Sequence, residues 1–150
     1  MTTMMKRRRA LTVAAGLAGA LCWRTAEATA DELAAAVRTF AAGGAVTAGR
    51  VTFEIAPLVE NGNVVPISVS VQSPMTEADH VQAIAVFNER NPQRDVAVFQ
   101  LGPRAGRAKV STRIRLATSQ QLVAVAKMSD GSCWTQTVDV LVTLAACVEP

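Results

Sequence analysis

The residue best placed for chemistry in this chain is Cys147, in the tail Ala145-Ala146-Cys147-Val148-Glu149-Pro150. This tail follows residues 138–144, whose alternation of apolar and polar side chains predicts the final β-strand of a domain. A thiol just beyond the last strand is tethered and exposed instead of filling a core. We therefore expect Cys147 to be a covalent attachment point, with residues 145–150 forming a flexible arm.

The rest of the sequence offers little for catalysis or metal binding. His80 is the one histidine of the chain, and zinc sites use three or four ligands. We expect His80 to lie at the start of a strand, with a metal site as the alternative. Cys133 follows a tight turn beside an aromatic residue, and we interpret it as a half-buried small apolar residue. The sequence therefore predicts no catalytic residues, no cofactor and no metal.

A disulfide between Cys133 and Cys147 is not expected. If residues 134–144 form one strand, the two Cα atoms lie on the order of 40 Å apart, at about 3.3 Å per residue. A disulfide requires roughly 4.4–6.8 Å between these atoms. Cys147 is therefore expected to react with a substrate or with another protein.

The first 28 residues have the composition of an export signal. Lys6 and Arg7–Arg9 precede a short apolar run at residues 10–23, and Ala26-Glu27-Ala28 has the small-x-small pattern of a cleavage site. The arginines and the leucine that follows resemble a twin-arginine signal. The apolar run is too short for a stable transmembrane helix. We expect cleavage after Ala28 and a mature periplasmic protein without a stable membrane anchor.

The basic charge of the chain belongs mostly to this signal. Residues 1–28 hold five of the 15 Lys and Arg residues but only one of the 12 Asp and Glu residues. The remaining chain has few aromatic residues and no basic run, which are the features that mark nucleic-acid binding. Nucleic acid is therefore not expected as a partner.

Residues 29–144 predict one β-domain that opens with a short helix. Thr29 and Glu32 match a capping box, and Gly43-Gly44 ends the helix. The apolar period then changes to two, with turn signals such as Asn61-Gly62 between segments. Seven strands are predicted, at residues 51–55, 67–71, 81–88, 96–101, 110–116, 122–128 and 138–144. This number of strands without a helical crossover indicates an all-β, immunoglobulin-like β-sandwich.

The outward faces of two strands are candidate partner surfaces. Arg113 and Arg115 lie on one, and Leu141 lies among polar neighbours such as Asp139 on the other. One interpretation is a solvated sheet face with cross-strand charge pairing. The other is a partner-binding surface, which Leu141 favours.

Several segments resemble the SoxY family of thiosulfate-oxidation carrier proteins. They are Asn61-Gly62-Asn63-Val64-Val65-Pro66-Ile67, Asn91-Pro92, Phe99-Gln100-Leu101-Gly102-Pro103, Ser111-Thr112-Arg113-Ile114-Arg115-Leu116-Ala117 and Ser129-Asp130-Gly131. The resemblance implies an immunoglobulin-like sandwich, export from the cytoplasm and a heterodimer with a SoxZ-like subunit. It also implies that Cys147 carries sulfur intermediates covalently for sulfur-oxidation enzymes.

The arm departs from the Gly-Gly-Cys-Gly-Gly ending that is typical of this family. Here Ala145, Ala146, Val148, Glu149 and Pro150 flank the cysteine, which resembles the SoxY-related variant subgroup with an Ala-Ala-Cys-Ile-Glu arm. Glycine allows backbone angles that alanine, valine and proline do not, so this arm should be stiffer. The expected function is a periplasmic, non-catalytic sulfur carrier. The alternative is a non-catalytic interaction subunit whose terminal cysteine is incidental or links it to a partner.

Overall fold

The computed structural model describes residues 24–146 of the chain. The chain divides into two units, with the boundary between Asp31 and Glu32. This boundary falls inside helix α2 (Arg24–Phe40), whose first eight residues are the described part of the first unit. The second unit holds the remainder of α2 and the strands.

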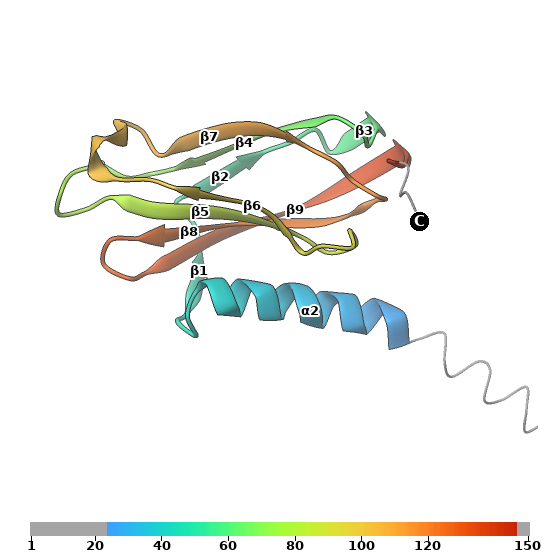
Figure 1. Ribbon diagram of the computed structural model, residues 1–150, viewed down its shortest axis with the longest axis horizontal. Coiled ribbons are helices and arrows are strands. Elements are labelled where there is room, and N and C mark those ends of the chain that lie inside the picture. The colour runs from blue at the N-terminus through green and yellow to red at the C-terminus, as the bar shows by residue number, and fades with distance from the viewer. Residues whose placement is uncertain (1–23, 147–150) are drawn as a thin grey trace, which may run out of the picture. The chain divides into compact units, whose positions relative to one another are not determined.

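The described residues of the second unit form two β-sheets. The larger sheet has the order β1-β9-β8-β5-β6, with β3 also paired to β9, and the smaller sheet has the order β2-β4-β7. The strands are β1 (Val46–Ala48), β2 (Val51–Glu54), β3 (Leu58–Asn61), β4 (Val65–Val71), β5 (Val81–Asn88), β6 (Asp95–Gln100), β7 (Lys109–Ile114), β8 (Gln120–Met128) and β9 (Cys133–Leu144), with a 3-10 turn at Pro103–Ala105. The sheets lie in two layers (Figure 1), which confirms the predicted immunoglobulin-like sandwich.

The main core fills the space between the two sheets. Alternate residues of β4, such as Val65 and Val69, are buried and belong to the same cluster as Ile84 of β5 and Leu122 of β8. This alternation follows from the period of two along a strand, which places every second side chain on the inner face.

A second apolar cluster explains why β5 lacks that alternation. Leu33 of α2 belongs to it together with Ala85 and Phe87 of β5. The rings of Phe40 and Phe87 meet edge to face, with centroids 5.9 Å apart. Residues 32–40 of α2 thus cover the outer face of the larger sheet, and β5 is buried on both faces.

The helix begins earlier than the capping box indicates. It starts at Arg24, so Thr29 lies in its interior, and the prediction that Thr29 is the N-cap is wrong. Alanine has the highest helix propensity, and the alanine-rich sequence before Thr29 continues the helix upstream. The helix ends close to the predicted Gly43-Gly44, since Phe40 is its last residue and Gly43, three positions later, adopts φ +77°.

Two strands were missed from the sequence, β1 and β3. Both pair in parallel with the same edge of β9, β1 at its beginning and β3 at its end. The intervening β2 belongs to the other sheet. Strand β1 has three residues and β3 has a single buried residue, so neither shows a periodic pattern. Both pair with β9, which lies far away in the sequence.

Candidate functional site

Four of the six predicted arm residues, Cys147, Val148, Glu149 and Pro150, lie outside the described residues. The structure describes the other two, which join the arm to β9. Ala145 is exposed, whereas Ala146 is only 6% exposed. The candidate site can therefore be built up to the residue directly before the cysteine.

Three backbone hydrogen bonds hold this junction. The N–H of Gly62 donates to the carbonyl oxygen of Leu144 at 2.8 Å. The N–H of Leu116 donates to the carbonyl oxygen of Gly62, also at 2.8 Å. The N–H of Ala146 then donates to the carbonyl oxygen of Leu116 at 3.1 Å. We call the four residues Gly62, Leu116, Leu144 and Ala146 the arm root.

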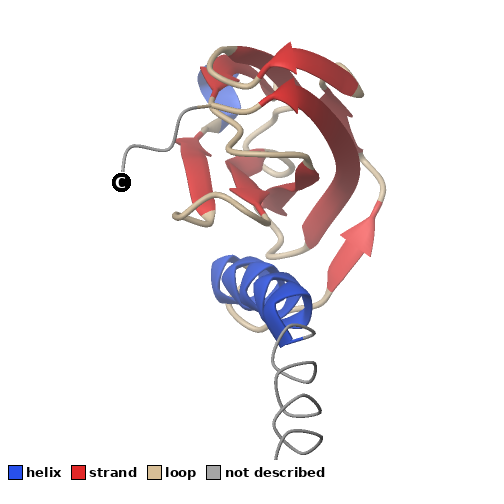
Figure 2. Cartoon of the chain, turned by 90° about the vertical axis from the view of Figure 1, so that its right-hand side faces the viewer, coloured by secondary structure: helices blue, strands red, loops and turns tan. Residues whose placement is uncertain are grey.

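The turn that supplies Gly62 passes from one sheet to the other. Asn61 ends β3 and lies in register with Leu144 of β9, whereas Val65 begins β4 in the smaller sheet. The Asn61 side-chain oxygen accepts a hydrogen bond from the backbone N–H of Asn63 at 2.9 Å, which stabilises the turn. Figure 2 looks onto the end of the molecule at which β9 finishes. The predicted Asn61-Gly62 turn is present, and it brings Gly62 to the last residue of β9.

Close approach of backbone atoms requires glycine at position 62. A Cβ atom there would lie 2.4 Å from the carbonyl oxygen of Leu116 and 2.9 Å from the amide nitrogen of Ala146. The φ angle of Gly62 lies outside the left-handed region. Position 62 therefore requires glycine because a Cβ atom would clash, and not because of an unusual backbone conformation. The backbone atoms of Leu116 and Ala146 occupy the volume that a side chain would need.

Asn91 holds both residues that flank Leu116. Its side-chain nitrogen donates to the carbonyl oxygen of Arg115 at 2.8 Å. Its side-chain oxygen accepts from the N–H of Ala117 at 3.0 Å and from the side chain of buried Gln120 at 2.7 Å. The sequence analysis named Asn91-Pro92 only among the segments that carry the family resemblance, because the segments that Asn91 joins are far apart in the chain.

Exposed leucines surround the end of β9. Leu58 and Leu141 lie side by side in register on β3 and β9, with 55% and 63% of their surfaces exposed. Leu144, in the arm root, is 61% exposed. Leu141 was singled out from the sequence, whereas Leu58 was missed together with β3.

Cys133 is a free thiol at the other end of β9. It is 2% exposed and belongs to the cluster beneath α2, so it is buried more completely than expected. Burial raises its pKa, an effect opposed by Lys127 and reinforced by Asp130. The strand beyond it is continuous to Leu144, as the argument against a disulfide with Cys147 assumed.

His80 has a structural position just before β5. Its ring Nδ1 lies 3.0 Å from the carbonyl oxygen of Thr76, and its backbone N–H donates to the Ser129 hydroxyl at 3.1 Å. The part of the chain that is described contains no group of three or more His, Cys, Asp or Glu side chains that could hold a metal ion. His80 thus connects the loop at Thr76 with the loop at Ser129 through hydrogen bonds. Its position directly before β5 agrees with the prediction that it lies at the start of a strand.

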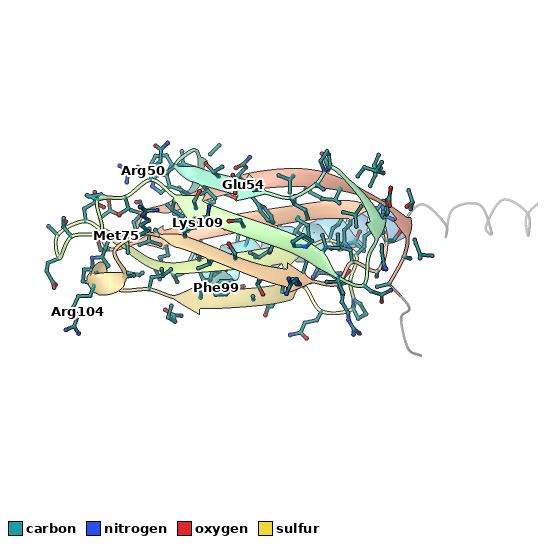
Figure 3. The ribbon with its side chains drawn as sticks, turned by 90° about the horizontal axis from the view of Figure 1, so that it is seen from above. Arg50, Glu54, Met75, Phe99, Arg104 and Lys109 are labelled. Carbon is teal, nitrogen blue, oxygen red and sulfur yellow. The ribbon has the colours of Figure 1, made fainter. Side chains whose placement is uncertain are left out.

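Charged side chains lie on the outer face of the smaller sheet. Glu54 and Lys109 lie on it (Figure 3), 4.0 Å apart. Arg113 on β7 and Arg115 just beyond its end are exposed, and neither forms an ion pair with any described residue. Cross-strand charge pairing, one of the two interpretations of this face, is therefore not made by Arg113 or Arg115.

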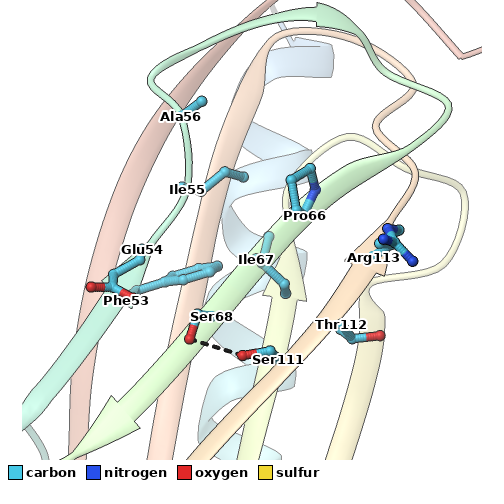
Figure 4. A pocket seen from close by; sticks show the side chains of 10 residues that line it. All are labelled: Phe53, Glu54, Ile55, Ala56, Pro66, Ile67, Ser68, Ser111, Thr112 and Arg113. Carbon is cyan, nitrogen blue, oxygen red and sulfur yellow. Dashed lines mark hydrogen bonds between the residues drawn. The ribbon is translucent and has the colours of Figure 1, made fainter.

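A shallow pocket lies on the same sheet, where β2 and β4 separate. Pairing between these strands ends at Glu54 and Ser68, and the opening is lined by half-buried Ile55 and buried Ile67 (Figure 4). The Ser111 hydroxyl donates to the Ser68 hydroxyl across it at 3.1 Å. With no cysteine or histidine in its lining, this pocket has no group for sulfur chemistry.

Among the described residues, no helix is both long enough and apolar enough to span a membrane. A comparison with curated protein sequences gave no match. The family model described as sulfur oxidation protein SoxY matches residues 37–147 of the chain. The matched segment includes the whole sandwich and extends to Cys147.

Solved structures give a consistent picture. The sulfur carrier protein SoxY from Chlorobium limicola f thiosulfatophilum is similar, with a TM-score of 0.64 and 26% sequence identity over 77% of this chain and 99% of that chain. The superoxide reductase (neelaredoxin) from Ignicoccus hospitalis is similar with a TM-score of 0.56 and 18% identity, over 63% of this chain and 80% of that chain. An identity of 18% indicates only a shared fold.

Proposed function

The chain belongs to the SoxY family of sulfur oxidation proteins, and we propose that it is a sulfur carrier that holds oxidation intermediates on Cys147. The observation that carries this proposal is the family match, which extends through the arm root to Cys147 itself. Similarity to a sulfur carrier protein over 99% of that protein's length supports it. The protein would act as a substrate of other enzymes and not as a catalyst.

The chemistry of such a carrier requires partner enzymes. Joining the Cys147 thiol to thiosulfate through a new S–S bond releases one proton and two electrons, so an electron-accepting partner must take part. Later oxidation of the bound sulfur and hydrolysis from the cysteine also need catalytic groups. The described residues of this chain bring no such groups together near the arm root, which is formed by backbone atoms and apolar side chains.

The arm sequence suggests which enzymes would process the cargo. We place the chain in the variant subgroup with Ala145 and Ala146 before the cysteine and Val148-Glu149 after it. These residues are bulkier and stiffer than glycine, so channels shaped for a glycine arm would admit this arm poorly. Enzymes adapted to the bulkier arm are the proposed partners.

We further propose a heterodimer with a SoxZ-like subunit, formed through the face that contains Leu58 and Leu141. Two neighbouring, exposed leucines on paired strands form an apolar patch, and apolar patches of this kind are frequent at protein interfaces. The choice of a SoxZ-like subunit as occupant rests on the family to which the chain belongs. Asp139, an exposed neighbour on the same face of β9, would lie at the rim.

The proposed location is the periplasm. Residues 1–28 have the composition of a twin-arginine-like export signal. An N-terminal sequence of the protein recovered from the periplasmic fraction tests this, with a start close to Thr29 expected. Recovery of the protein only from the cytoplasm, with Met1 or Thr2 at its start, would contradict it.

Thiol labelling in the native host tests the carrier proposal. Cells growing on a reduced sulfur compound should contain protein whose Cys147 cannot be alkylated until reductant is added. Cells growing without reduced sulfur should contain mostly free Cys147. A free thiol under both conditions would favour the alternative of an interaction subunit with an incidental cysteine.

A further inference from the structure

We propose that the opening between β2 and β4 is a docking site for an extended, acidic segment of a partner protein. The segment places one apolar side chain in the opening and one carboxylate, two residues away along its chain, against Arg113. This site lies on the smaller sheet, whereas the leucine patch proposed for a SoxZ-like subunit lies on the larger sheet. The inference adds a second partner surface and does not depend on sulfur chemistry.

The opening exists because β2 and β4 stop pairing at a proline. Glu54 lies opposite Ser68 in the last pair, and two residues further on the same register would bring Ala56 opposite Pro66. Proline has no backbone N–H to donate, and no hydrogen bond joins Ala56 to Pro66. The chain instead continues to β3, which pairs with β9 in the larger sheet. The backbone N–H of Ala56 therefore makes no hydrogen bond with any described residue.

Apolar side chains form the walls and the floor of the opening. Half-buried Ile55 and exposed Pro66 lie on its two sides (Figure 4). Phe53 and Ile67, which are buried and belong to the core, form the floor. The volume is about 1020 Å³, which is at the upper end of the range for pockets that bind drug-sized molecules. An apolar side chain that enters the opening loses its contact with water, and this favours binding.

The charges around the opening favour an acidic segment. Arg113 belongs to the lining, is exposed and forms no ion pair with any described residue. Strands β2, β4 and β7, together with Arg115 directly after β7, hold three cations and one carboxylate. That carboxylate, Glu54, lies 4.0 Å from Lys109. Arg113 is thus free to hold a partner's carboxylate through two parallel hydrogen bonds.

The geometry of the sheet sets the spacing between the two groups of the segment. Arg113 lies opposite Pro66, on the strand next to β4. Neighbouring strands are about 4.8 Å apart, so the opening on the other side of β4 lies about 7 Å from Arg113. An extended chain rises about 3.3 Å per residue, and its alternate side chains point to the same side. A carboxylate two residues from the apolar side chain therefore reaches Arg113.

Synthetic peptides test the proposal by NMR titration of the isotope-labelled protein. The probe is acetyl-Ser-Leu-Ser-Asp-Ser-amide, in which leucine and aspartate have the required spacing. Acetyl-Ser-Leu-Asp-Ser-Ser-amide is the control, because it has the same composition and charge but places the two residues side by side. We expect the probe to shift the amide signals of Ile55, Ala56 and Arg113. It should bind about fivefold more tightly than the control, as gain of one exposed ion pair allows.

Two charge reversals test the role of the arginine. Arg113→Glu replaces attraction by repulsion and should weaken binding of the probe about tenfold. Arg104→Glu is the matched control, because it makes the same charge change on the 3-10 turn at Pro103–Ala105, outside the lining of the opening. It should change the Kd less than about twofold, since distant exposed charges are screened by salt.

Equal binding of the two peptides would overturn the proposal, as would equal binding of the probe by the unaltered protein and Arg113→Glu. Signal shifts confined to Leu58 and Leu141 would also overturn it, because the peptide would then occupy the leucine patch. The same holds for an absence of shifts at millimolar peptide. Both variants replace exposed side chains, and their amide spectra show whether they fold. The peptides bind without sulfur on the protein, so failure here leaves the carrier function intact.

Discussion

Leu58 of β3 lies beside Leu141 of β9 in a parallel strand pair, and both side chains are largely exposed. This pairing results from β3, a short strand that returns from the smaller sheet to the edge of β9. Two neighbouring leucines exposed on one surface have no role in the core of the described chain. Their arrangement supports the partner surface proposed for a SoxZ-like subunit.

Replacing Leu141 by lysine should weaken that pairing and leave the fold intact. A charge at the centre of an apolar contact costs about 1.4 kcal/mol or more, so the Kd for a SoxZ-like subunit should rise about tenfold or more. Titration calorimetry with the purified subunits measures this. Thr137→Lys, on the same strand and the same face, is the control and should change the Kd much less. Equal Kd values for both variants and the unaltered protein would refute the assigned surface.

Replacing Asn91 by alanine should destabilise the protein and loosen the arm root. Its side chain makes hydrogen bonds to Arg115, Ala117 and Gln120. Leaving such groups unsatisfied costs about 1–3 kcal/mol, and this loss should appear in urea unfolding. Gln93→Ala, an exposed change in the same loop, should stay within about 0.5 kcal/mol. If amide exchange at Ala146 is unchanged in Asn91→Ala, Asn91 does not support the arm root.

The buried thiol of Cys133 should make stability depend on pH in the alkaline range. Burial raises the pKa of this thiol above its ordinary value of 9.0. The folded form therefore keeps its proton after the unfolded chain has lost it. The resulting stabilisation is complete below the pKa of the unfolded state and is lost as pH rises through the pKa of the folded state.

Unfolding free energies of the unaltered protein and Cys133→Ala test this sign. The unaltered protein should be more stable near pH 8, because alanine leaves a small cavity. The difference between the two should shrink as the pH rises beyond about 9. A difference that stays constant to pH 10.5 would show that the thiol is not shielded as the structure indicates.

The sequence was sufficient to predict the sandwich because several strands carry their own alternation, and β5, which is buried on both faces, is a continuous apolar run between turn signals. The residues of β4 illustrate this, since alternate side chains are buried along its whole length. Strand β1 has only three residues, and β3 has a single buried residue, so neither shows such a pattern. The start of α2 was misplaced because a capping motif at Thr29 was given more weight than the helix propensity of the alanines before it.

The arm root could not be predicted in the same way. Asn61-Gly62 was recognised as a turn, but the reason for its glycine is contact with Leu116 and Ala146, which lie 54 and 84 positions later in the chain. Contacts between such distant segments leave no local periodicity. The sequence shows only a glycine within a turn. A glycine there can indicate either close contact with other backbone atoms or a left-handed backbone conformation, and the sequence alone does not distinguish the two.

Site-resolved mass spectrometry of the protein from cells oxidising sulfur compounds tests the central claim most directly. The account predicts a reductant-labile adduct of sulfur or sulfonate on the peptide that contains Cys147. The adduct should be absent from Cys133 and from a Cys147→Ser variant that still folds and still binds its partner. Protein that carries only an unmodified Cys147 thiol under these conditions would contradict the carrier function.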